Sequence, residues 1–223
     1  MGKIPGEIFL VVPAGGRGLR LGGGVPKQFR DWGGRPLLLA TLEAFFSPGM
    51  PPLDGIALAV PPEFVDLPPT WKLPVPLRVG PGGETRQDSV RAALELLPDR
   101  PEAAVMIHDA VRPFPPAQGV LEALEALGEW DGALLTEPST DTLKQVDRSG
   151  RVLQTLHREG ILRAQTPQVA LLGTWREAFQ QALTTGFQAT DDSALLERFG
   201  FKVLAVPGAP SNRKITLPGD WSP

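Results

Sequence analysis

The chain alternates between short apolar runs and amphipathic stretches, and few architectures accept such an order of elements. The apolar runs predict strands at 7–13, 55–60, 77–79, 103–108, 132–137 and 202–207, and helical spacing predicts helices at 36–46, 89–97, 118–127, 174–183 and 193–199. This alternation predicts an α/β fold with a Rossmann-like, mainly parallel sheet and helices on both faces. Because ligands of such sheets bind beyond the carboxyl ends of the strands, the loops after the strands are the places to search for function.

Length, charge and composition narrow the class of protein. At roughly 150 residues per domain, a chain of 223 residues predicts a single domain over 1–223. Its net charge of −3 does not suggest a general nucleic-acid binder. The absence of cysteine and the presence of only 2 histidines exclude a disulfide framework, a thiolate nucleophile and a Cys- or His-rich metal centre. No apolar run has membrane length and no signal peptide is visible, so we expect a cytoplasmic protein that does not enter a membrane.

One segment departs from the alternation. Residues 142–147 and 151–158 are two polar runs around Arg148-Ser149-Gly150, which predicts a β-hairpin arm at about 139–160. An isolated two-stranded hairpin is marginally stable in water. We therefore expect the arm to pack on something, and both a partner subunit and an edge position in the same sheet fit the pattern.

The loop after the first strand carries the strongest functional signal. It runs from Ala14-Gly15-Gly16 to Pro26-Lys27 and contains six glycines and the cations Arg17, Arg20 and Lys27. Glycines let backbone N–H groups approach an anion closely, and three clustered cations repel one another unless an anion binds them. The order of residues fits neither a P-loop nor a dinucleotide-binding fingerprint. We interpret the loop as a phosphate-binding loop rather than as a flexible connector.

A second signal lies between the third strand and the following helix, where Gly82-Gly83 precedes Ser89. A helix N-terminus next to glycine backbone can hold an anion or read the edge of a base. Thr85 and Asp88 equally predict a capping box, which needs no ligand. Both interpretations stay open.

A third signal is His108-Asp109, which ends a strand in the middle of the sheet, with Arg112 three residues on. Asp109 could accept hydrogen bonds from ribose hydroxyls or hold a divalent metal. Arg112 could bind a phosphate through two hydrogen bonds. A structural Asp–Arg pair is the alternative, and His108 is expected to be a packed, hydrogen-bonded core residue.

The remaining candidates are scattered, and each taken singly fits a surface residue or a cap. Thr166-Pro167-Gln168 predicts a turn, and Thr190-Asp191-Asp192-Ser193 predicts the N-cap of the following helix. Lys214 is expected on a short terminal strand at 212–216.

Together the motifs resemble one family. Ala14-Gly15-Gly16-Arg17-Gly18-x-Arg20 with Pro26-Lys27 resembles the signature of sugar-phosphate nucleotidyltransferases, with Gly15 in place of a usual alanine. The full set is similar to the 2-C-methyl-D-erythritol 4-phosphate cytidylyltransferase family of non-mevalonate isoprenoid biosynthesis. It adds Gly82-Gly83-x-x-Arg86-x-Asp88-Ser89, His108-Asp109-Ala110-x-Arg112-Pro113, Asp141-Thr142-x-Lys144, Thr166-Pro167-Gln168, Thr190-Asp191 with Ser193, and Lys214-Ile215-Thr216.

The resemblance implies a reaction and a set of roles. CTP and methylerythritol 4-phosphate would give 4-diphosphocytidyl-2-C-methyl-D-erythritol and pyrophosphate, with Mg²⁺ bound mainly through the CTP phosphates and no dedicated protein metal site. The chain would form a homodimer that exchanges its arms. The expected catalytic residues are Arg20, Lys27 and Lys214; the expected CTP-binding residues are Ala14, Gly15, Gly16, Gly83, Ser89 and Asp109; and the expected residues of the acceptor pocket are Arg112, Thr142, Arg158, Thr166, Thr190 and Asp191.

The sequence leaves three other functions open. One is a cytidylyltransferase for another polyol phosphate, such as ribitol 5-phosphate. Another is an NAD(P)-dependent oxidoreductase on a doubly wound sheet, and the third is a nucleotide-binding module without activity. The main interpretation requires that Lys27 and Lys214, distant in sequence, meet over one nucleoside triphosphate.

Overall fold

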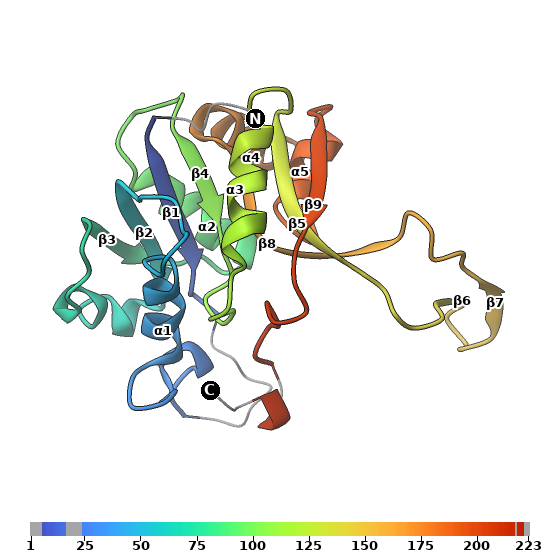
Figure 1. Ribbon diagram of the computed structural model, residues 1–223, viewed down its shortest axis with the longest axis horizontal. Helices are drawn as coiled ribbons and strands as arrows, with labels where there is room; N and C mark the ends of the chain where they lie inside the picture. Colours follow the sequence, from blue (N-terminus) through green and yellow to red (C-terminus); the bar gives the residue numbers. More distant parts are fainter. Residues whose placement is uncertain (1–5, 17–23, 217, 221–223) are drawn as a thin grey trace.

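The computed structural model describes residues 6–16, 24–216 and 218–220. The strands are β1 (Ile8–Pro13), β2 (Gly55–Val60), β3 (Leu77–Pro81), β4 (Ala104–Ile107), β5 (Gly132–Pro138), β6 (Lys144–Val146), β7 (Val152–Thr155), β8 (Leu162–Leu171) and β9 (Val203–Pro207). In the described residues they form a seven-stranded sheet in the order β3-β2-β1-β4-β8-β5-β9 and a separate sheet of β6 and β7 (Figure 1). β8 runs antiparallel to β4 and β5, and the other neighbours in the large sheet are parallel.

Helices cover both faces of this sheet, as the alternation predicted. They are α1 (Leu37–Ala44), α2 (Arg86–Glu95), α3 (Ala117–Ala126), α4 (Leu172–Thr185) and α5 (Ser193–Arg198), with short 3-10 helices η2 (Lys27–Phe29), η3 (Pro62–Phe64), η4 (Pro68–Thr70) and η5 (Pro218–Asp220). Side chains alternate between the two faces of a strand. Leu10 and Val12 of β1 therefore join the core under α1 and α3, whereas Phe9 and Val11 join the core under α2, α4 and α5.

The chain order of the strands creates a switch point beside β1. The chain goes from β1 to β2 and β3 on one side, and then crosses through α2 to β4 on the other side. The loops after β1 and β4 consequently diverge at the carboxyl edge of the sheet. Such a divergence leaves a crevice in which ligands of open α/β sheets bind.

Two local predictions are wrong. Residues Thr166-Pro167-Gln168 do not form a turn but lie inside the ten-residue strand β8, where the Thr166–Pro167 peptide bond is cis. The predicted strand at 212–216 is not a strand of either sheet among the described residues, although Ile215 N donates to Val111 O at 2.9 Å. A proline within a run argues locally against a strand, and a single backbone bond does not make one.

The predicted arm is a separate hairpin. β6 and β7 pair antiparallel and their residues are exposed. Figure 1 shows the hairpin extending away from the body of the molecule on the connection between β5 and β8. The edge position in the main sheet, which the sequence left open, is therefore excluded.

Candidate functional site

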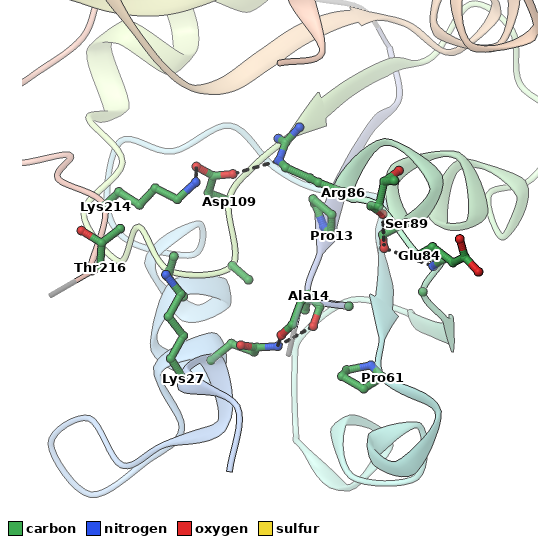
Figure 2. Close-up of a pocket in the computed structure, with 18 of the residues that line it drawn as sticks. Pro13, Ala14, Lys27, Pro61, Glu84, Arg86, Ser89, Asp109, Lys214 and Thr216 are labelled. Carbon is green, nitrogen blue, oxygen red and sulfur yellow. Dashed lines mark hydrogen bonds and ion pairs between the residues drawn. The ribbon is translucent and has the colours of Figure 1, made fainter. Parts of the chain in front are cut away.

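A pocket of about 970 Å³ lies at the predicted crevice (Figure 2). Its walls come from the loops after β1, β3 and β4, the start of α2, the turn after β2 and the chain segment near the C-terminus. The lining residues are Pro13, Ala14, Gly15, Gly16, Lys27, Gln28, Pro61, Pro62, Gly82, Gly83, Glu84, Thr85, Arg86, Ser89, Asp109, Ala110, Val111, Lys214 and Thr216.

The described part of the glycine-rich loop is held by backbone and amide contacts. Ala14 N donates to Ala59 O at 2.7 Å, which continues the pairing of β1 with β2. The buried amide of Gln28 then donates to Ala14 O at 2.6 Å and to Gly16 O at 2.8 Å. These bonds fix the first residues of the loop at the mouth of β1.

The start of α2 forms the wall opposite the lysines. Thr85 and Asp88 make the capping box that the sequence left as an alternative, so this helix begins three residues earlier than predicted. Ser89 Oγ donates to Thr85 O at 3.0 Å and accepts from Gly83 N at 3.2 Å. The capping box does not exclude a role in ligand binding, because Gly83 and Ser89 at the same helix start both line the pocket.

Asp109 is the electrostatic centre of the site. Its Oδ1 lies 3.3 Å from Arg86 Nε, and its Oδ2 lies 3.1 Å from Arg112 Nε and 3.0 Å from Lys214 Nζ. Burial alone would raise the pKa of Asp109, but Arg86, Lys214 and Arg112 together hold that pKa far below its ordinary value. The structural Asp–Arg pair therefore exists, and two further cations share the same carboxylate.

The two predicted catalytic lysines lie together. Lys27 Nζ donates to Ile215 O at 3.1 Å, and Ile215 directly follows Lys214. Figure 2 shows Lys27, Lys214 and Thr216 on one side of the pocket, with Ser89, Glu84 and Pro61 on the other. Residues far apart in the sequence thus bring positive charge to one wall, as the main interpretation required.

His108 supports the turn that presents Asp109 and Arg112. The carbonyl of Arg112 can only accept, so His108 Nε2 carries the proton that it donates at 2.9 Å. His108 Nδ1 is then the acceptor for Thr166 Oγ1 at 3.1 Å, and Thr166 Oγ1 accepts from Asp109 N at 3.0 Å. Burial lowers the pKa of His108 to about 4, so the ring is neutral, as expected of a core histidine.

Of the other predicted residues, Arg112 and Asp191 make polar contacts within the fold. Arg20 lies outside the described residues. Arg112 contacts Asp109 and donates to Asn212 O at 2.7 Å. Asp191 Oδ2 accepts from Gln168 Nε2 at 2.9 Å, and Thr190 beside it is exposed.

Thr142 and Arg158 lie on the exposed arm, away from this chain's pocket. Arg158 Nη1 donates to Thr140 O at 2.7 Å, a bond within the base of the arm. Within one chain, therefore, these two residues are not brought to the described pocket.

Sequence reasoning assigned no role to Arg86 or Gln28, which both line the pocket. Arg86 is the first residue of α2, and its Nη2 lies 2.7 Å from Asp192 Oδ2. The sequence signal that could have identified Arg86 is its position two residues before Asp88, in the motif that begins with Gly82-Gly83. Gln28 adjoins Lys27, but nothing in the sequence shows that its amide turns back onto the loop.

Comparisons with known proteins agree with this arrangement. The family model described as 2-C-methyl-D-erythritol 4-phosphate cytidylyltransferase (IspD) matches residues 8–222. A protein of that name from Acidobacterium capsulatum is 37% identical over 226 residues, covering 96% of this chain and 94% of the relative. The crystal structure of the Francisella tularensis protein of that name superposes with a TM-score of 0.82 at 29% identity, covering 96% of both chains. The crystal structure of the protein of that name from Thermus thermophilus superposes with a TM-score of 0.77 at 32% identity, covering 96% of this chain and 95% of that one.

These matches span nearly the whole chain and carry the same name as the resemblance seen in the sequence motifs. They support the main interpretation and neither the other polyol phosphate nor the oxidoreductase. Within the described ranges, no helix has the length and apolar character that crossing a membrane requires. The chain belongs to the 2-C-methyl-D-erythritol 4-phosphate cytidylyltransferase family, which makes it a nucleotidyltransferase.

Proposed function

We propose that this chain transfers a cytidylyl group from CTP to 2-C-methyl-D-erythritol 4-phosphate. A phosphate oxygen of the acceptor attacks the α-phosphorus of CTP in line. The new P–O bond forms as the bond between the α-phosphorus and the bridging oxygen of the β-phosphate breaks, and pyrophosphate leaves. The observation that carries this proposal is the meeting of Lys27 and Lys214 on one wall of a pocket that opens at the glycine-rich loop.

The chain's contribution is positioning and fixed positive charge. Negative charge grows on the equatorial and leaving oxygens during phosphoryl-group transfer, and preorganised cations stabilise it. Lys27, with Arg20, is assigned to the transition state and the leaving group, and Lys214 to the attacked phosphate. The acceptor phosphate is already ionised near neutral pH, so the attack needs no general base.

The opposite wall is assigned to the nucleoside. Ala14, Gly15, Gly83 and Ser89 would contact the cytosine, and Gly16 and Asp109 the ribose and phosphates. The close packing of Gly15, Gly82 and Ser89 at the pocket supports this, because an added Cβ atom on either glycine would lie within 3 Å of Ser89 Oγ.

Mg²⁺ fits the donors of this pocket. It is commonly held by one or two carboxylates together with substrate phosphates, and Asp109 supplies a buried carboxylate where the phosphates would lie. The ion would be bound mainly through CTP oxygens, and Asp109 would be the protein group that helps to hold it. When bound, it would neutralise charge on the triphosphate.

A homodimer with exchanged arms completes the proposal, in a chain that works in the cytoplasm. Arg112 lies at the pocket, whereas Thr142 and Arg158 lie on an exposed arm. An acceptor pocket made from both sets needs a second copy. Thr166, Thr190 and Asp191 would support that pocket from behind, through the contacts of Thr166 with Asp109 and of Asp191 with Gln168.

The test is release of pyrophosphate, measured with a coupled pyrophosphatase and phosphate detection. All four nucleoside triphosphates are compared, with methylerythritol phosphate and with ribitol 5-phosphate as acceptors. Release that needs both CTP and methylerythritol phosphate is expected. Preference for ribitol 5-phosphate, or binding of NAD(P) without pyrophosphate release, would refute the proposal.

A further inference from the structure

The three cations around Asp109 do not hold it in the same way. Oδ1 pairs with Arg86, whereas Oδ2 is shared by Arg112 and Lys214. Arg86 and Lys214 line the pocket together with Asp109. A polyphosphate that enters therefore meets the ammonium of Lys214 while it is still paired with a carboxylate of the protein.

Lys214 is the cation best placed to leave Asp109. Its side chain is 40% exposed, compared with 33% for Arg86 and 12% for Arg112. An ammonium on a flexible four-carbon stem reorients more readily than a planar guanidinium. Its departure takes one cation from a buried carboxylate, which is unfavourable unless the remaining partners stay in place.

Arg86 is anchored independently of the pocket. Its Nη2 lies 2.7 Å from Asp192 Oδ2, and the side chain of Asp192 is only 2% exposed. The fork of donors on one guanidinium can hold two carboxylates at once. Figure 2 shows Arg86 reaching Asp109 from the side opposite to Lys214. The Arg86 contact to Asp109 therefore does not depend on where Lys214 points.

We propose that Arg86 is a positioning residue. It keeps the negative charge of Asp109 paired, so that Lys214 can move from Asp109 to the nucleoside triphosphate. This role rests on the proposed function and adds a residue to it. Without Arg86, Oδ1 of Asp109 has no arginine, the carboxylate holds Lys214 more strongly, and the triphosphate meets one cation fewer. The effect of Arg86 on catalysis is exerted through Lys214 and not through contact with substrate.

A double-mutant cycle between Arg86 and Lys214 tests this role. Arg86→Met alone would leave buried Asp192 unpaired and could prevent folding, so it is combined with Asp192→Asn. With Lys214 present, we expect this pair to lower kcat/KM for CTP by roughly 10- to 100-fold, as for a misplaced catalytic group. In a Lys214→Met background, the same pair should change kcat/KM by less than about threefold, since coupled residues are not additive. An equal loss in both backgrounds overturns the proposal, because it indicates direct substrate contact or general damage.

Two further variants serve as controls for this cycle. Arg91→Met removes an arginine from the same helix, where it pairs with Glu95 at 3.0 Å, and should keep wild-type activity and thermal stability. Arg86→Lys keeps a charge but replaces two separate donors, Nε on Asp109 and Nη2 on Asp192, by a single ammonium nitrogen, so the activity of this variant should fall too. Wild-type turnover of Arg86→Lys would count against the proposal.

Binding of CTP without acceptor, measured by isothermal titration calorimetry, separates this inference from the proposed function. A wild-type chain that binds CTP but never releases pyrophosphate would refute the function. The same cycle, read as dissociation constants for CTP, would still test Arg86: the Arg86–Asp192 pair should weaken binding only when Lys214 is present.

Discussion

The ammonium nitrogen of Lys27 lies 3.1 Å from the carbonyl oxygen of Ile215, although 188 positions separate the two residues. Ile215 N in turn donates to Val111 O at 2.9 Å, two residues beyond Asp109. The loop after β1, the loop after β4 and the segment near the C-terminus are thereby joined around one pocket. The role assigned to Lys27 depends on this junction.

Replacing Lys27 should abolish most of the activity. We expect Lys27→Ala to lower kcat by about 10²–10³-fold, as for the loss of one preorganised group that stabilises the transition state. Steady-state pyrophosphate release measures it. Lys72→Ala, which removes an exposed lysine outside the pocket lining, is the matched control. Near-normal turnover of Lys27→Ala would rule out its assigned role.

Replacing Arg158 should weaken acceptor binding instead. We expect Arg158→Ala to raise KM for methylerythritol phosphate roughly tenfold, as for loss of a charged hydrogen bond, with a smaller change in KM for CTP. Mixing this variant with Lys27→Ala should restore activity, because a mixed dimer contains one site with neither change. If the mixture shows only the summed activity of its two components, the arms are not exchanged.

The exposed valine pair of the arm should carry the dimer contact. Val146 and Val152 are paired across the hairpin and are 51% and 56% exposed. Their replacement by aspartate should shift the sedimentation coefficient toward that of a monomer, since exposed apolar patches mark interfaces. Gln145 and Gln154 form the neighbouring pair, and their replacement by aspartate is the charge-matched control. A dimer that survives the valine changes would place the interface elsewhere.

A methyl group at position 15, where the family that the motifs resemble usually has alanine, should disturb the wall assigned to the nucleoside only through the Ser89 hydroxyl. A Cβ atom on Gly15 would lie 2.7 Å from Ser89 Oγ, whereas one on exposed Gly6 would meet nothing within 4 Å. Gly15→Ala should push the Ser89 hydroxyl away from Gly83 N. Loss of about one hydrogen bond, or about 1 kcal/mol, corresponds to a roughly fivefold rise in KM for CTP. Gly6→Ala should leave KM unchanged, and an equal KM in both variants would contradict the close fit.

Stability should fall in acid through His108. Its pKa is lowered from 6.5 to about 4 by burial, so between these pH values the unfolded chain binds a proton that the folded chain does not. The contribution of neutral His108 to the free energy of unfolding is fully present above pH 6.5. It is lost as the pH falls to about 4, and the loss amounts to at most about 3 kcal/mol. Thermal unfolding of wild type and His108→Gln across this range measures the difference in slope. Parallel curves would show that His108 is not responsible.

The layers of the fold could be predicted because burial imposes period 2 on the strands and helical spacing on the helices. Gly55–Val60 matches β2 at both ends. The direction of β8 could not be predicted in this way. Its residues Thr166-Pro167 read locally as a turn, and only the pairing with β4 and β5 makes them a strand.

The site could be predicted where charge gathers in a loop and not where a contact depends on tertiary structure. Lys27 and Asp109 follow predicted strands, so topology places them at one edge of the sheet. Arg86 gains its importance from Asp192, 106 positions away, and no local pattern connects those two residues. Thr166 contacts Asp109 only because β8 lies beside β4.

The base of the arm is closed by the main sheet itself. Pro138, the last residue of β5, stands in register with Leu162, the first residue of β8. The ladder of backbone hydrogen bonds is therefore complete before the hairpin begins. A change in the length or surface of the hairpin beyond that rung therefore leaves the pairing of β5 with β8 in place, so the arm can be altered without refolding the sheet that carries the pocket.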